Sequence, residues 1–349
     1  MSAAEMSLGV LASVVVLGGF AVSAVCQQAG LSQSGAAKTW KASRTWDGQP
    51  DLQGVWMDNF ATPVERPKQL EARATLTDAE VAEMKQRAAR IFEPGGGSDY
   101  AAGDAVFLTA LANPREFKNP NSTSGAVEMP PRDFDNRTSL VVDPPDGRIP
   151  PLTAEARQRL AGRSGALAAG LRPPDRVQDL SSAIRCITAG VPRIGGRYGA
   201  GDFGNYQIFQ GPGYVVLFSE VIHEIRLIPL DGRPHLPQNV RSWSGDSRGR
   251  WEGDTLVVDT TNFSPQTNFM GAAENLHLIE RFTRVAADEI RYEVTVDDRT
   301  TWTRPWTVMV RLIQSQERMF EFACHEGNAA VLEDMLTAAR AGDKRDGAR

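Results

Sequence analysis

The sequence predicts a mainly β protein, an antiparallel, calycin-like β-barrel with a partly helical insertion between the first strand and the main β-region. Between Asn205 and Asn328, apolar and β-branched runs alternate with turn residues at a spacing of roughly eight to twelve residues, which is typical of an antiparallel sandwich or barrel. An earlier strand is expected at Gly54–Trp56. Added to about eight later strands, it would let the sheet close on itself and remove exposed edges.

The expected first strand carries a short recognisable pattern. Gly54-Val55-Trp56 follows a turn-rich segment and resembles the Gly-X-Trp opening strand of lipocalin-type barrels, in which the tryptophan plugs one end of the barrel. The alternative is an ordinary core tryptophan on a strand.

Turn residues bound the strands of the main β-region. Gly211-Pro212-Gly213, Gly253-Asp254 and Ala286-Ala287-Asp288 each separate the two strands of a hairpin. The expected strands are Tyr206–Gln210, Tyr214–Glu220, His223–Pro229, Gly249–Glu252, Thr255–Thr261, Leu276–Val285, Glu289–Asp297, Trp306–Ile313 and Arg318–Cys324.

The stretch from about 61 to 204 has a different character, and we expect it to be an insertion with short helices. Thr77 and Glu80 have the spacing of a capping box, which favours a helix start. Thr153 is a second expected N-cap. The expected elements are a helix from Thr77 to about Phe92, a strand at Ser139–Val142 with a turn and a second short strand, a helix from Thr153 to about Ala161, and a helix at Asp179–Ile187.

The length, composition and net charge of the chain limit its domain organisation and its possible binding partners. A chain of 349 residues with 41% hydrophobic residues can build one sizeable core. We expect a linker at 27–50, a single barrel domain at 51–330 and a C-terminal helix or frayed tail at 331–349. The net charge of −5 indicates no strongly basic face, which argues against a nucleic-acid partner.

The N-terminus is expected to be an export signal. Leu8–Val25 is nearly all apolar or small, and Val22-Ser23-Ala24 suits signal peptidase. Cys26 stands where a lipoprotein cysteine would. Residues 1–26 are therefore expected to be a signal peptide or lipoprotein signal. The protein would be exported, either periplasmic or lipid-anchored to the cell envelope, and a single N-terminal membrane anchor is the alternative.

Beyond Cys26, the chain contains Cys186 and Cys324. Two cysteines in an oxidising compartment usually pair, so we expect a disulfide that closes a loop of about 140 residues, worth ~4–5 kcal/mol on the loop-entropy model. Two unpaired buried thiols are the alternative. A catalytic cysteine is less favoured, because a free thiolate is vulnerable outside the cell.

All four histidines, at 223, 235, 277 and 325, fall within the main β-region. Strand periodicity places His277 on the face opposite Glu280, and His223 on the face opposite Glu224 and Arg226. For each histidine, a strand residue that donates to a neighbouring carbonyl is the ordinary alternative to a functional role.

The first site model is general acid/base catalysis. Neutral imidazole near physiological pH suits proton abstraction, and a neighbouring carboxylate raises its basicity. His223 or His277 would be the base, with Glu220, Glu280 or Asp259 orienting the ring. Arg226 or Arg281 would stabilise developing negative charge. The expected catalytic set is His223, Glu220, Arg226, His277, Glu280, Asp246 and His325.

A divalent metal is the second model. Two or three of the four histidines His223, His235, His277 and His325, together with Glu224, Glu280 or Glu326, would suit Zn, Fe or Mn. The sequence contains neither His-X-His nor His-Glu-X-X-His, so the spacing gives no metal motif. No cofactor is predicted in the first model.

The third model is a non-catalytic, lipocalin-like binder of an apolar or aromatic ligand. Aromatic side chains would line the lumen, or alternatively they would simply fill the core. The expected substrate-binding residues are Tyr214, Phe218, Trp243, Trp302 and Trp306.

Several segments together resemble a large uncharacterised family of exported proteins that is abundant in soil bacteria. They are Asp47–Trp56, Arg137–Arg148, His223–Arg226, Gly245–Thr255 and Ala323–Asn328. The resemblance covers most of the chain after the signal and implies a shared fold and export, but no reaction. The stretch 95–135 departs from the pattern, which implies a different substrate if it lines the pocket.

Taken together, the sequence predicts an exported small-molecule enzyme of the lyase, hydrolase or isomerase type that uses His–carboxylate chemistry in a barrel pocket. A ligand-binding barrel is the first alternative, and a metal-dependent barrel enzyme is the second.

Overall fold

The computed structural model describes residues 40–90, 105–113, 132–162, 174–194 and 205–346. The expected export signal at 1–26 and most of the expected linker lie outside this range. Among the helices of the described segments, none is long and apolar enough to cross a membrane.

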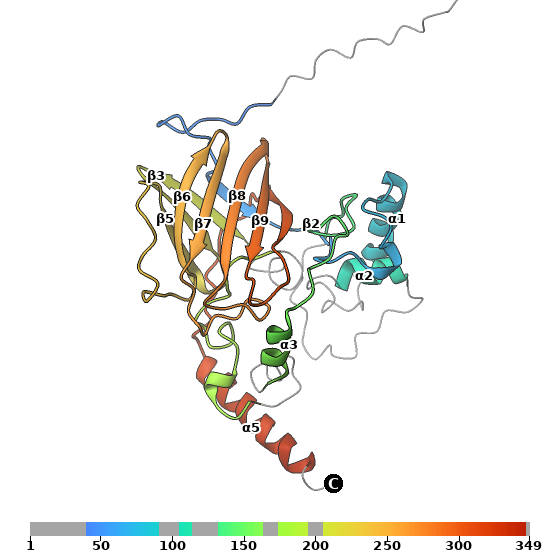
Figure 1. The fold of residues 1–349 in the computed structure, drawn as a ribbon. Coiled ribbons are helices and arrows are strands. Elements are labelled where there is room, and N and C mark those ends of the chain that lie inside the picture. The colour runs from blue at the N-terminus through green and yellow to red at the C-terminus, as the bar shows by residue number, and fades with distance from the viewer. Residues whose placement is uncertain (1–39, 91–104, 114–131, 163–173, 195–204, 347–349) are drawn as a thin grey trace, which may run out of the picture. The chain divides into compact units, whose positions relative to one another are not determined.

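One antiparallel sheet dominates the structure (Figure 1). Its path is β5-β4-β3-β1-β10-β9-β8-β7-β6, and β2 adds to β10. The strands are β1 Gly54–Met57, β2 Val141–Asp143, β3 Tyr206–Gly211, β4 Tyr214–Ser219, β5 Glu224–Pro229, β6 Asp246–Glu252, β7 Thr255–Thr261, β8 His277–Ala286, β9 Glu289–Asp297 and β10 Trp306–Gln314. The predicted mainly β class, with a nearly closed antiparallel barrel, is confirmed.

The two end strands of the sheet meet where a glycine lets them approach. A Cβ added at Gly249 of β6 would come within 2.7 Å of Ile228 Cγ2 in β5 and within 2.6 Å of Leu230 Cδ2. A larger residue at this position would force the Ile228 and Leu230 side chains to shift, so glycine favours the close packing of β5 and β6 here.

Strand β1 joins two groups of strands. It pairs with β3 on one side and with β10 on the other, so the early strand predicted from Gly54-Val55-Trp56 is confirmed. Trp56 is fully buried and donates its indole N–H to Leu52 O at 2.9 Å. The Arg284 guanidinium lies 5.3 Å above the Trp56 ring, a distance that allows a cation–π interaction.

The strand predicted at Arg318–Cys324 is wrong. After β10 the chain is irregular and then forms helix α5, Asn328–Asp346. The reason is the occupancy of β10: one edge pairs with β9, and the other pairs with β1 at one end and β2 at the other. No edge of β10 remains for a further hairpin partner. Helix α5 covers most of the segment for which a C-terminal helix or a frayed tail is expected.

The helices predicted from N-caps are confirmed. Helix α1, Asp78–Ala89, has the complete capping box between Thr77 and Glu80. Helix α3, Ala154–Ala161, begins at Thr153, whose hydroxyl accepts from Ala156 N.

Two predictions in the insertion are wrong. The helix expected at Asp179–Ile187 is replaced by a 3₁₀ turn at Val177–Asp179 followed by turns, in which Cys186 has a left-handed φ of 53°. The short strand expected after the turn at residue 147 does not form, because β2 pairs with β10 instead. Helix α2, Ala105–Ala112, was not predicted; its Val106 and Phe107 are buried with α1 in a second, smaller core.

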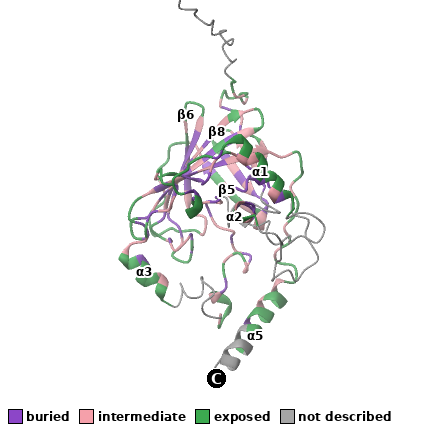
Figure 2. Ribbon diagram, turned by 90° about the vertical axis from the view of Figure 1, so that its right-hand side faces the viewer, coloured by how far each residue is buried: buried purple, intermediate pink, exposed green. Residues whose placement is uncertain are grey.

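Burial concentrates on the sheet (Figure 2). The inward positions of β7 to β10 are apolar and fully buried at Leu256, Val294 and Val308. The outer face of β5 is also apolar but open to solvent, with Ile225 64% and Leu227 59% exposed. Apolar residues on the inner strand faces therefore fill the core, whereas those on the outer face of β5 form an uncovered surface.

The disulfide between Cys186 and Cys324 is present, with Cα atoms 5.7 Å apart and a sequence separation of 138. It ties the segment before β3 to the irregular chain after β10. The predicted pairing is confirmed, and it is compatible with an exported protein.

Candidate functional site

A small cavity opens among the inward side chains of the barrel. Its volume is about 30 Å³, room for about two water molecules. Strands β3, β4, β5, β8, β9 and β10 supply most of its wall, and a segment outside the strands completes it. The lining residues are Gly190, Val191, Arg193, Tyr206, Ile208, Leu217, Ser219, Glu224, Arg226, Glu280, Phe282, Tyr292 and Leu312.

A buried ion pair crosses the inside of the barrel. Arg226 donates to Glu280 from Nη1 at 3.0 Å and from Nη2 at 2.5 Å, and the side chains are 10% and 0% exposed. Nη2 also lies 3.1 Å from Ser247 Oγ and 3.2 Å from Thr260 Oγ1. Burial lowers the pKa of Arg226, but the Glu280 carboxylate outweighs burial and raises it. Arg226 is therefore permanently charged.

Tyr292 completes this network. Its hydroxyl donates to Glu280 Oε1 at 2.6 Å. Burial, together with the neighbouring Glu280 charge, raises the pKa of Tyr292 well above its ordinary value, so the phenol stays protonated. The Glu280 carboxylate thus accepts from both a guanidinium and a phenol, an arrangement that compensates much of the cost of burying its charge.

A second polar group of residues lies at the same cavity. Burial raises the pKa of Tyr206, whose hydroxyl lies 3.5 Å from Arg193 O. Arg193 donates to Ser219 Oγ at 2.9 Å. Glu224 accepts from Thr188 Oγ1 at 2.7 and 2.8 Å and also from the Ser244 hydroxyl. These contacts link the wall segment before β3 to strands β4 and β5.

Of the residues expected to be catalytic, Arg226 and Glu280 meet at the cavity, whereas Glu220 does not line it. Glu220 is 1% exposed and accepts from Asn205 Nδ2 at 2.8 Å and from Phe320 N at 2.7 Å. Its carboxylate therefore holds the chain after β10 in place.

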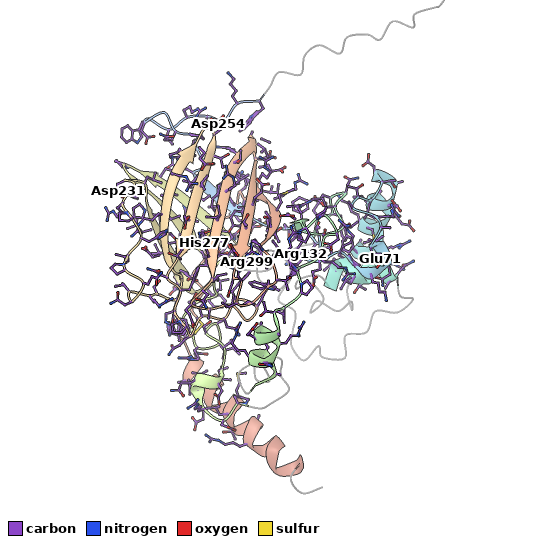
Figure 3. All side chains as sticks on the ribbon, in the orientation of Figure 1. Glu71, Arg132, Asp231, Asp254, His277 and Arg299 are labelled. Carbon is purple, nitrogen blue, oxygen red and sulfur yellow. A yellow bond between two sulfur atoms is a disulfide. The ribbon has the colours of Figure 1, made fainter. Side chains whose placement is uncertain are left out.

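A His–Asp network forms on the outer face of the sheet. His277 of β8, labelled in Figure 3, places Nε2 3.0 Å from Asp259 Oδ1 of β7. His235, from the loop before β6, bridges Asp246 Oδ2 at 3.0 Å through Nδ1 and Asp259 Oδ1 at 3.1 Å through Nε2. Arg248 adds a contact of 2.6 Å to Asp246 Oδ1. The structure thus brings Asp246 and His277 into one network.

The electrostatic environment of this network favours a protonated His277 beside an ionised Asp259. The hydrogen bond to Asp259 is the main reason that the pKa of His277 is raised. Burial raises the pKa of Asp259, but hydrogen bonds and charges of His277 and His235 outweigh it and lower the pKa. The pKa of Asp246 is lowered in the same way: burial opposes the shift, while the Leu236 amide, His235 and Arg248 produce it.

Stability should depend on pH through His277 and Asp259. Because the pKa of His277 is raised in the folded protein, its protonation adds to the free energy of unfolding. This contribution is complete below about pH 6.5 and is lost as the pH rises through the pKa of the folded state. Because the pKa of Asp259 is lowered, its ionisation adds a contribution that is present above about pH 3.9 and is lost on acidification. We expect His277→Asn to cost more stability at pH 5.5 than at pH 9, by less than about 1 kcal/mol because His277 is 41% exposed. Urea unfolding at both pH values measures this, and a larger cost at pH 9 would contradict it.

Neither His223 nor His325 is among the residues that line the cavity or form the His–Asp network. His223 is exposed and ends a short 3₁₀ turn with a φ of 50°, so it is not part of β5. His325 is exposed in the turn after Cys324. Within the described segments, no group of three or more His, Cys, Asp or Glu side chains is arranged to hold a metal ion.

The expected substrate-binding aromatics do not line the cavity. Tyr214 is 42% exposed and Phe218 lies on the same outer face of β4. Trp302 and Trp306 are buried and pack edge-to-face, with ring centroids 5.5 Å apart, so they fill the core. Trp243 is half-buried in the loop before β6.

The aromatic residues that do line the cavity are Tyr206, Phe282 and Tyr292. The spacing along β9 could have identified Tyr292. Ile290, Tyr292 and Val294 are every second residue of the strand and all are buried, so they share the inward face.

Comparisons with protein-family models, with curated proteins and with solved structures found no match to this chain. Its function therefore has to be inferred from the geometry of the chain itself.

Proposed function

We propose that this protein binds a small organic molecule inside the barrel, in the cavity beside Arg226 and Glu280. The observation that carries the proposal is the buried Arg226–Glu280 ion pair, which also accepts a hydrogen bond from the protonated Tyr292, in a mainly apolar cavity. Polar groups that converge on an apolar cavity are the usual make-up of a ligand site, and a buried charge that only supported the fold could be replaced by apolar residues at little cost.

The volume of the cavity limits the ligand. About 30 Å³ holds about two water molecules, so a larger ligand enters only if part of the wall moves. Gly190, Val191 and Arg193 belong to a segment outside the strands, and side-chain hydrogen bonds from Thr188 and Arg193 hold it to the barrel. We propose that this segment opens to admit the ligand and then closes over it.

Filling the cavity should abolish binding. Leu312 lines the cavity and is 2% exposed; a Leu312→Phe substitution adds volume there. The matched control is Leu256→Phe, a substitution of the same kind at a fully buried residue that is not among the cavity-lining residues. Both should cost about 1–3 kcal/mol of stability through overpacking. We expect fluorine-detected NMR screening of small fragments to find ligands for the natural protein and for Leu256→Phe, and to lose them in Leu312→Phe.

If no fragment binds the natural protein, or if those that bind are retained by Leu312→Phe, the cavity is not the binding site.

A second candidate function is acid/base catalysis by His277 and Asp259, the reaction type expected from the sequence. The 3.0 Å contact of His277 with Asp259 and the raised pKa of His277 favour it, because a carboxylate that orients an imidazole and raises its basicity makes it a better general base. The substrate would bind on the outer face of β7 and β8, outside the barrel.

Replacing His277 tests that candidate. We expect His277→Gln to lower the turnover of a panel of small nitrophenyl esters by about 100-fold or more. His325→Gln, at another exposed histidine, should leave turnover unchanged. Equal rates in the natural protein and both variants would count against His277 as a base.

We further propose that the protein is exported, as the N-terminal sequence predicts, either to the periplasm or as a lipid-anchored protein. The Cys186–Cys324 disulfide supports an oxidising compartment. Cell fractionation with mass analysis of the mature N-terminus tests this, and an intact Met1 in the cytoplasmic fraction would exclude it.

A further inference from the structure

The cavity itself constrains the chemical class of its ligand. We infer, resting on the function proposed above, that the ligand is an uncharged, compact molecule with an apolar body and one acceptor oxygen, and that this oxygen accepts a hydrogen bond from Nε of Arg226.

The first argument is an unused donor. The Nη1 and Nη2 atoms of Arg226 are bonded to Glu280, Ser247 and Thr260. Its Nε is buried and has no hydrogen-bond partner in the described part of the chain, although the side chain lines the cavity. Buried donors are almost always paired, so an unpaired guanidinium N–H beside a cavity is a position that a ligand acceptor would complete.

The second argument is charge. The cavity is lined by two arginines, at 193 and 226, and two glutamates, at 224 and 280, so its formal charges cancel. Arg226 and Glu280 already neutralise each other. A ligand carboxylate would bring a third negative charge beside Glu280 and Glu224, and a ligand ammonium would lie near two guanidiniums. Either charge would be buried without a counter-ion, which is strongly unfavourable.

The third argument is the rest of the wall. Ile208, Leu217, Phe282 and Leu312 provide an apolar surface that favours a hydrocarbon body. The protonated Tyr292 already donates to Glu280, so its proton is not available to a ligand. The hydrogen bond from Arg226 therefore fixes the orientation of a ligand that is otherwise held by apolar contact.

Four ligands of nearly equal size test the inference without changing the protein. Cyclopentanone carries the acceptor, methylenecyclopentane has the same shape without it, and cyclopentanecarboxylate and cyclopentylamine carry opposite charges. We expect NMR titration to show that the ketone binds about ten-fold or more tightly than its methylene analogue and more tightly than both ions. Leu312→Phe should abolish ketone binding, and Leu256→Phe should not.

The outcomes separate the inference from the function on which it rests. Equal affinity for the ketone and the methylene analogue would overturn the hydrogen bond while leaving a binding cavity intact. Tightest binding of the carboxylate or the amine would overturn the uncharged class. Absence of ketone binding would overturn the inference. The proposed binding function would then still stand if the fragment screen finds ligands that Leu312→Phe removes, and it would fail if the screen finds none.

Discussion

Replacing Glu280 by glutamine should lower the free energy of unfolding by about 3–5 kcal/mol. The substitution keeps the shape of the side chain and removes its charge. Arg226 stays charged because it cannot lose its proton in a protein, and it remains 10% exposed without the carboxylate to which it donates both Nη hydrogen bonds. The bond from the Tyr292 hydroxyl would also weaken, since charge-assisted bonds are stronger than neutral ones. Urea unfolding of the natural protein and the variant measures the difference.

The matched control is Glu252→Gln. Glu252 accepts from Arg281 at 2.7 Å and from Arg250 at 2.6 Å, but its side chain is 39% exposed. Exposed pairs contribute at most about 1 kcal/mol, so this variant should remain close to the natural protein. A Glu280→Gln cost as small as the Glu252→Gln cost would mean that water reaches the pair and would remove the basis for a dry, neutral site.

A double substitution separates charge from packing. In Arg226→Met with Glu280→Leu both charges are lost together, and the stability should recover most of the deficit of Glu280→Gln, because apolar residues often replace a buried ion pair at little cost. Recovery of stability with loss of ligand binding would assign the pair to function. Retention of ligand binding in the double variant would contradict that assignment.

Removing the disulfide by Cys186→Ala with Cys324→Ala should cost about 2–5 kcal/mol. The bridge closes a loop across a sequence separation of 138, and the entropy that it removes from the unfolded chain grows slowly with loop length. Without the bridge, the segment before β3 remains attached to the barrel only by contacts such as the Thr188–Glu224 hydrogen bond. Unfolding by urea in non-reducing buffer measures the cost.

A reducing agent provides the control for this substitution. It should destabilise the natural protein to about the level of the double variant and should leave the double variant unchanged. A double variant that unfolds within about 1 kcal/mol of the oxidised protein would show that the unfolded chain is already compact around this loop.

The strands could be predicted because the features that define a strand lie in neighbouring residues of the sequence. Turn residues such as Gly211-Pro212-Gly213 mark where a strand ends, and alternation fixes which side chains share a face. The facing predicted for His277 and Glu280 is correct for this reason: His277 contacts Asp259 on the outside, and Glu280 contacts Arg226 on the inside.

The candidate site could be predicted only in part, because its contacts are not local. Arg226 and Glu280 lie on strands that are not neighbours in the sheet, so their meeting depends on closure of the barrel. His235 lies in a loop, where no periodicity indicates that its ring bridges Asp246 and Asp259. The strand expected at Arg318–Cys324 failed for the same reason: local pattern cannot show that both edges of β10 are occupied.

The position of β1 has a consequence for how the chain acquires its structure. Strands β3 to β5 and strands β6 to β10 each pair in sequence order and can assemble from short-range contacts, as ribbons that zip from their turns. Val55 pairs with Gln207, whereas Trp56 pairs with Gln314 near the far end of the chain. Such distant partners close the largest loops and form slowly. We expect amide protection in refolding to reach Trp56 after Phe282 of β8, and the reverse order would contradict this. The first of the described strands to be synthesised would then be the last to pair, and it would join the two groups of strands into one sheet.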